Sequence, residues 1–64
     1  MQAAIYGPEG HRLSAEERAF FRDAAPAGFI LFRRNCADRD QVRALTDSLR
    51  ELVGRDDVPI LIDQ

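Results

Sequence analysis

Short apolar runs and longer amphipathic segments alternate along this chain of 64 residues. Two of the runs, residues 28–32 and 58–62, are rich in Phe, Ile, Leu and Val. Short runs that are apolar at successive positions are typical of strands covered on both faces of a parallel sheet. A weaker strand is expected at residues 3–7, where only Ile5 and Tyr6 favour extended structure. The alternation predicts an α/β fold of the order β-α-β-α-β, with parallel strands joined by helical crossovers.

The segment after the first strand carries a helix-start signal. Ser14 is followed three positions later by Glu17, and this spacing predicts a capping box in which each side chain bonds the other residue's backbone amide. The helix is expected over residues 15–25 and should stop at Pro26. The residues expected on its inner face are Ala19, Phe20 and Ala24, with Phe21 nearby.

A second helix is expected over residues 39–53. Asp38 is its N-cap, Gln41 stands in the matching capping-box position, and Gly54 is suited to follow its last turn. The apolar stripe at helical spacing consists of Val42, Leu45, Leu49, Leu52 and Val53. Three pairs of opposite charge on the other face are expected to interact, namely Asp40–Arg43, Arg43–Asp47 and Asp47–Arg50.

Composition narrows the classes of function. Nine basic residues, all arginine, and eleven acidic residues give a net charge of −2, which offers no electrostatic basis for binding nucleic acid or an anionic membrane. No apolar run is long enough to span a bilayer, and no secretory signal is evident. Cys36 is the only cysteine, so no internal disulfide can form, and we expect a cytoplasmic protein. Neither a metal-ligand cluster nor a glycine-rich phosphate loop is present.

Parallel strands bring their carboxyl ends to one edge of the sheet, where ligands of α/β proteins usually bind. Three polar segments should meet there, namely Gly7-Pro8-Glu9, Arg33-Arg34-Asn35 and Asp63-Gln64. Their mixed charge suits a hydroxyl-rich or anionic small ligand. Asp63 is the candidate binding residue, and the alternatives are that it caps a following helix or pairs with an arginine. For Arg34 and Asn35 a solvated loop is favoured over a binding role.

Three other residues carry groups that could take part in chemistry. His11 lies in a polar loop, so no catalytic role is expected for it. Cys36 has no partner base in the chain and is expected to pack as a small residue near a helix start. Glu9 would act as a general acid only if a second carboxylate faced it, which the spacing along the sequence does not show.

Two segments and the helix between them carry a resemblance to a known family. Residues 28–35 (G-F-I-L-F-R-R-N), the D-x-x-Q-x-x-x-L pattern over residues 38–45, and residues 60–64 (I-L-I-D-Q) resemble the opening of the bacterial β-N-acetylhexosaminidases of glycoside hydrolase family three. The similarity covers essentially the whole chain. It implies a (β/α)8 TIM barrel of about 250 residues, of which residues 1–64 would be an N-terminal fragment.

The resemblance also implies an activity. Family enzymes are retaining glycosidases that release terminal non-reducing N-acetylglucosamine from peptidoglycan fragments during cell-wall recycling, in the cytoplasm and without a cofactor. Asp63 matches the family aspartate that hydrogen-bonds sugar hydroxyls. The family's aspartate nucleophile and histidine acid/base lie later in the chain, and His11 does not match that histidine. The segment alone is therefore expected to be inactive, and the parent enzyme is expected to be a monomer.

Two other classes of protein stay open from the residues alone. One is a small self-associating binding or regulatory α/β module without catalysis, which would pair through its open sheet edges. The other is part of a doubly wound nucleotide-binding protein, which the missing glycine fingerprint disfavours.

Overall fold

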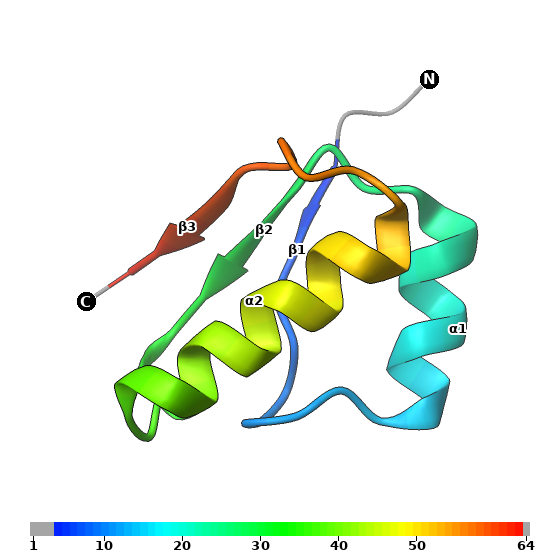
Figure 1. Ribbon diagram of the computed structural model, residues 1–64. Coiled ribbons are helices and arrows are strands. Elements are labelled where there is room, and N and C mark those ends of the chain that lie inside the picture. The colour runs from blue at the N-terminus through cyan, green and yellow to red at the C-terminus, as the bar shows by residue number, and fades with distance from the viewer. Residues whose placement is uncertain (1–3, 64) are drawn as a thin grey trace.

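The computed structural model describes residues 4–63 and shows a three-stranded sheet with two helices (Figure 1). The elements are β1 (Ile5–Tyr6), α1 (Ala15–Ala24), β2 (Gly28–Leu31), α2 (Arg39–Val53) and β3 (Ile60–Ile62), with a 3-10 turn at Arg33–Asn35. All strands are parallel, in the order β1-β2-β3. The predicted α/β fold is confirmed, with shorter strands than expected. Ala3, at the start of the first predicted strand, and Gln64, from the predicted polar edge, lie outside the described residues.

Both helices lie on the same face of the sheet, with α2 crossing in front of the strands and α1 beside it (Figure 1). Successive side chains of a strand point to opposite faces. On β2, Phe29 and Leu31 are fully buried in one core with α2, whereas Ile30 is only half-buried. Its register partner Leu61 is 54% exposed. Within residues 4–63 the helices therefore cover only one face of the sheet, because both crossovers place their helices on the same side.

The core lies between this face and the helices. Its buried apolar residues are Leu13, Phe21, Phe29, Leu31, Leu45, Leu49 and Val58. The inner face of α1 differs from the prediction: Ala19, Phe20 and Ala24 are exposed, and Phe21 is the buried residue of this helix. The reason is the ring of Phe29, which Phe21 meets edge-on with ring centroids 5.3 Å apart. Phe20 instead packs against Tyr6 on β1, with centroids 5.2 Å apart.

The capping box that begins α1 is confirmed. The amide of Glu17 donates to Ser14 Oγ at 3.0 Å, and the amide of Ser14 donates to Glu17 Oε1 at 3.1 Å. The second carboxylate oxygen of Glu17 accepts from the Glu9 amide at 2.9 Å, so the same side chain also ties the preceding loop to the helix. The helix ends one residue before the predicted position, because Ala25 adopts a left-handed conformation with φ of 46°.

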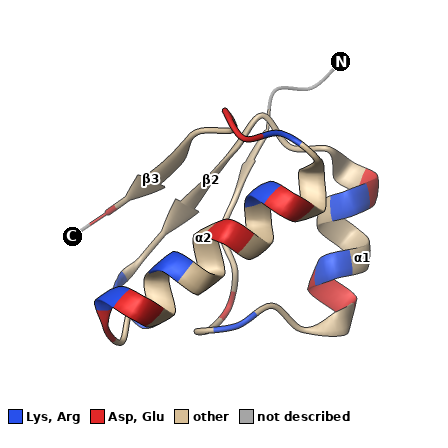
Figure 2. Cartoon of the chain, in the orientation of Figure 1, with Lys and Arg blue, Asp and Glu red and all other residues tan. Residues whose placement is uncertain are grey.

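The predicted bounds of α2 are confirmed, and Gly54 ends it with φ of 72°. Within the predicted stripe, Leu45 and Leu49 are buried and the other three residues are half-buried. Acidic and basic residues alternate along the helix (Figure 2). The three predicted ion pairs do not form, however: in residues 4–63 the only ion pair joins Arg55 Nε to Asp57 Oδ1 at 3.3 Å. Exposed side chains gain little from holding such pairs in one geometry.

Gly7 permits the close approach of β1's end to β2. A Cβ atom placed on Gly7 would lie 2.8 Å from the backbone oxygen of Ile30, a contact that only a backbone shift can relieve. We expect Gly7→Ala to destabilise the fold by about 1–3 kcal/mol. Gly10→Ala is the matched control, because nothing lies within 4 Å of a Cβ there. Urea unfolding followed by circular dichroism measures both, and equal midpoints would contradict the expectation.

Candidate functional site

The carboxyl ends of the three strands form one polar edge, as the sequence predicts. β2 and β3 point the same way in Figure 1, and the amide of Asp63 continues their ladder by donating to the Leu31 oxygen at 2.8 Å. Asp63 is exposed. Its carboxylate forms no hydrogen bond or ion pair with any residue in the described range 4–63. The alternative that Asp63 pairs with an arginine of this range is therefore not realised. Gln64 lies outside the described residues.

A hollow of about 310 Å³ lies beside Asp63. Arg33, Cys36 and Ile62 line the rest of it. It combines one acidic group, one basic group and an apolar side chain. Pockets that bind small polar molecules use this combination, in which apolar surface gives contact and a few polar groups fix orientation. The carboxylate of Asp63 can accept hydrogen bonds from hydroxyl groups, and the guanidinium of Arg33 can only donate them.

Asn35 has a role that the sequence did not predict. Instead of standing in a solvated loop, it is completely buried. Its Oδ1 accepts from the Phe32 amide at 2.8 Å, and its Nδ2 donates to the backbone oxygens of Pro8 at 2.9 Å and Gly10 at 2.8 Å. Both amide hydrogens and the amide oxygen of Asn35 therefore have partners. The side chain joins the loop after β1 to the turn after β2.

Gln41 adds a second connection between the same two loops. Its Nε2 donates to the backbone oxygens of His11 and Asn35, both at 2.8 Å. Its Oε1 accepts from the Ala37 amide at 2.7 Å, so the predicted reciprocal bond to the Asp38 amide is replaced by one to the residue before it. The other half of the cap is confirmed, since Asp38 Oδ1 accepts from the Gln41 amide at 2.8 Å. Asn35 and Gln41 together form what we call the amide clamp.

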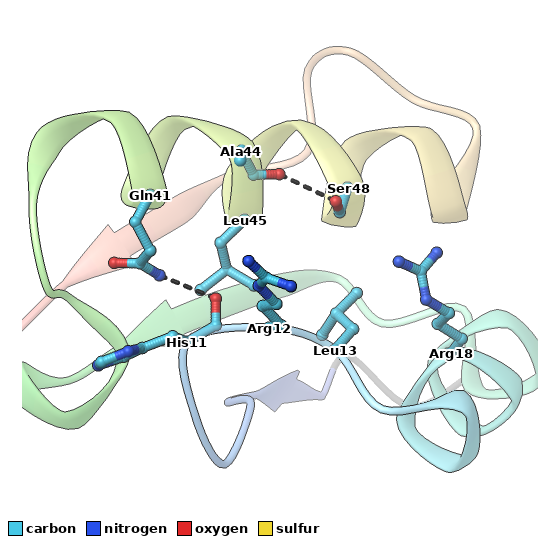
Figure 3. A pocket seen from close by; sticks show the side chains of 8 residues that line it. All are labelled: His11, Arg12, Leu13, Arg18, Gln41, Ala44, Leu45 and Ser48. Atoms are coloured by element: carbon cyan, nitrogen blue, oxygen red, sulfur yellow. Dashed lines mark hydrogen bonds between the residues drawn. The ribbon is translucent and has the colours of Figure 1, made fainter.

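The remaining candidates lie around this edge without forming a catalytic group. Arg34 is exposed and its guanidinium lies 4.9 Å from the ring centroid of Phe32. Cys36 is half-buried against the core, as predicted. His11 is exposed, and its ring points away from Gln41, whose amide meets the His11 backbone oxygen (Figure 3). Glu9 is also exposed.

Among residues 4–63, no three His, Cys, Asp or Glu side chains are grouped closely enough to hold a metal ion. Over the same residues, neither helix combines the length and the apolar character needed to cross a membrane.

The sequence signal for the amide clamp was present but incomplete. The sequence pattern identifies Gln41 as a helix-capping residue and Asn35 as a turn residue. Sequence pattern alone does not predict that residues 8–11 lie against these two side chains. The bonded residues are 25 to 30 positions apart in the chain. An Asn or Gln in one predicted βα loop, with a second βα loop expected beside it, would be the sequence signal for such a connection, because a buried amide needs hydrogen-bond partners.

Comparison with known proteins identifies relatives of the chain. No family model matches it. A protein named Beta-hexosaminidase from Methylococcus capsulatus is 48% identical over 54 residues, which are 84% of this chain and 16% of that protein. A second, from Alkalilimnicola ehrlichii, is 45% identical over 60 residues, which are 94% of this chain and 17% of that protein. A third, from Xanthomonas axonopodis pv. citri, is 42% identical over 58 residues, which are 91% and 16%.

These matches cover nearly all of the chain but little of each relative. The chain spans 16–17% of the length of these curated relatives. Over most of its own length, the chain is thus a relative of one segment of the bacterial beta-hexosaminidases.

Proposed function

We propose that the chain is the N-terminal part of the TIM barrel of a retaining β-N-acetylhexosaminidase of glycoside hydrolase family three, and that it is inactive on its own. The observation that carries the proposal is the identity of 42–48% to proteins named Beta-hexosaminidase over most of this chain. The substrate class is carbohydrate, namely terminal N-acetylglucosamine of peptidoglycan fragments. The proposed setting is cell-wall recycling in the cytoplasm, by a monomeric parent enzyme without a cofactor.

The topology supports a barrel over a doubly wound sheet. The strands follow one another in space in sequence order, and both helices cover the same face (Figure 1). When this pattern continues, the helices form an outer ring and the strands close inside it. In a doubly wound sheet the strand order reverses, and helices then cover both faces. The open face of this sheet would become the barrel interior.

Asp63 is the residue for which we propose a substrate contact. Its carboxylate stands at the carboxyl edge, is exposed, and has no partner among residues 4–63. Alternation along the strand puts it on the same face as Leu61, the face that would line the barrel. A free carboxylate there can accept hydrogen bonds from two neighbouring sugar hydroxyls.

The chemical step would use groups from the rest of the parent enzyme. In a retaining mechanism a carboxylate attacks the anomeric carbon, the aglycone leaves as an acid protonates its oxygen, and water then cleaves the glycosyl-enzyme. We propose that the nucleophile and the acid/base belong to the part of the relatives that this chain does not span. Residues 4–63 would supply binding and positioning, through Asp63 and the amide clamp.

A chimera tests the proposal directly. Residues 1–64 would replace the matching segment of the Methylococcus capsulatus relative, which is 48% identical. We expect the chimera to hydrolyse a chromogenic N-acetylglucosaminide and the 64-residue chain to show no turnover. A folded but inactive chimera would contradict the assignment to this enzyme family. Turnover by the chain alone would contradict its inactivity.

The second candidate function is a self-associating module, and exposed apolar residues favour it. Ile5 is 56% exposed, Leu61 54% and Ile62 52%, and one face of the sheet carries no helix (Figure 1). Such a module would form one defined oligomer, with an unfolding midpoint that rises with concentration. Part of a barrel would instead associate without a fixed stoichiometry, because the same surface lacks a complementary partner.

Leu61 is exposed on the open face of the sheet, which either kind of association would use. Leu61→Lys places a charge on the open face, so we expect it to shift the isolated chain toward monomer by about tenfold in association constant. Sedimentation velocity over a range of concentrations measures the shift. Ala19→Lys adds the same charge at an exposed position of α1 and should leave association unchanged. Equal effects of the two substitutions would show that net charge, not the open face, controls association.

A further inference from the structure

A groove runs between the two helices, on the side of the sheet that they cover. One hollow of about 330 Å³ is lined by Arg12, Arg18, Gln41 and Ser48 among others. A second, of about 350 Å³, is lined by Arg18, Arg22, Ser48, Glu51 and Leu52. Because Arg18 and Ser48 line both, the hollows are adjacent, and we call them together the inter-helix groove. It shares no lining residue with the hollow beside Asp63.

The inter-helix groove is basic in a chain that is acidic as a whole. Arg12, Arg18 and Arg22 face a single acidic lining residue, Glu51, whereas the formal net charge of the chain is −2. Within residues 4–63, none of the three guanidinium groups forms an ion pair or a hydrogen bond. Figure 3 shows the side chains of Arg12 and Arg18 extending toward α2 from the loop and from α1. Their donors are therefore available to a ligand.

The backbone that carries these arginines is held in place. Leu13, next to Arg12, is buried in the core together with Leu45 of α2. The bond from Gln41 Nε2 to the His11 oxygen, 2.8 Å long, fixes the other neighbour of Arg12 against α2 (Figure 3). A site whose walls are fixed before binding loses less conformational entropy when a ligand arrives. Only the arginine side chains themselves need to be ordered.

We propose that the inter-helix groove binds a compact anion of the diphosphate type. One phosphoryl group would lie between Arg12 and Arg18, and the other between Arg18 and Arg22. Guanidinium groups suit this ligand because their planar fork donates two parallel hydrogen bonds to phosphate oxygens. The site is independent of the proposed hexosaminidase function and would serve an effector or an accessory ligand.

Two features favour a compact anion over an extended polyanion. The hollows are small, at about 330 and 350 Å³, which is the low end of the range for small-molecule pockets. The rest of the exposed surface of α2 carries Asp40 and Asp47 alongside Arg39 and Arg43, so it offers no net positive charge to a polyanion extending beyond the groove.

The test is calorimetric titration with inorganic pyrophosphate at constant ionic strength. It is carried out on the chain and on the chimera described above, so that self-association of the isolated chain does not block the measurement. We expect saturable binding of one pyrophosphate, with a dissociation constant below about 1 mM. Orthophosphate should bind at least about tenfold more weakly, because it engages only one pair of arginines.

Matched variants separate the groove from net charge. The double substitution Arg12→Gln/Arg18→Gln should weaken binding by about a hundredfold, and each single substitution by about tenfold, since each removes a charge-assisted contact. Arg39→Gln/Arg43→Gln removes the same charge from exposed positions outside the groove and should change binding less than about threefold. The proposal is overturned if neither protein shows saturable binding, if both double variants lose affinity equally, or if orthophosphate binds as well as pyrophosphate.

Discussion

Replacing Asp63 with alanine in the chimera should lower kcat/KM for an N-acetylglucosaminide by at least about a hundredfold. A hydrogen bond to a charged group contributes about 1.5–3 kcal/mol, and each 1.36 kcal/mol corresponds to about tenfold in rate. Two sugar hydroxyls bonded to this carboxylate therefore account for the expected loss. Asp63→Asn should cost about tenfold, because the amide keeps one acceptor oxygen but not the charge. Initial rates over a range of substrate concentrations give kcat and KM separately.

Asp56→Asn provides the control for this experiment. Asp56 is an exposed carboxylate in the turn between α2 and β3, and it forms no hydrogen bond or ion pair within residues 4–63. Its substitution removes the same charge only a few positions away, so kcat/KM should stay within about twofold. If Asp63→Ala also left kcat/KM within that range, the proposed contact with the sugar would be wrong.

The second large effect is expected at Asn35. Asn35→Asp keeps the shape of the side chain but places a carboxylate oxygen against the backbone oxygens of Pro8 and Gly10. Two acceptors then lose their donor, one in a buried bond and one in a partly buried bond, and each such loss costs about 1–3 kcal/mol. We expect the chimera to lose at least about 3 kcal/mol in free energy of unfolding, measured by urea denaturation. Asn35→Ala should cost a similar amount, because it also leaves the Phe32 amide without its acceptor.

An isosteric exchange in the opposite direction, from Asp to Asn at an exposed position, tests whether burial causes the loss of stability at Asn35. Asp47→Asn exchanges the same two groups on the exposed surface of α2, away from the helix ends, and the free energy of unfolding should change by less than about 0.5 kcal/mol. A loss at Asn35 no greater than the loss at Asp47 would mean that the amide clamp does not contribute to stability.

The sequence predicted most of the secondary structure because its boundaries rest on local chemistry. Ser14 and Glu17 form the capping box that their spacing indicates, and Gly54 takes the positive φ that ends α2. The apolar stripe of α2 is strong enough to identify its buried side. In α1 the pattern was ambiguous, because Phe20 and Phe21 are adjacent and either can face inward. Contact with Phe29 on β2 decides between them, and local sequence does not contain that contact.

The candidate edge was predicted because parallel strands always bring their carboxyl ends together. The hydrogen bonds that join the loops of that edge were not predicted. Asn35 was expected in solvent, and its burial depends on backbone oxygens 25 and 27 positions away. The inter-helix groove escaped prediction for the same reason, since Arg12 and Ser48 meet only after the loop and α2 pack together.

The amide clamp has a consequence for the order in which the chain can fold during synthesis. The loop of residues 8–11 precedes α1, yet the side chains that hold it belong to Asn35 and Gln41. A nascent chain that has emerged only as far as the end of α1 holds this loop by the single bond from the Glu9 amide to Glu17. Since domains form as their chains leave the ribosome, the rim of the candidate site would become fixed only after the start of α2 has emerged.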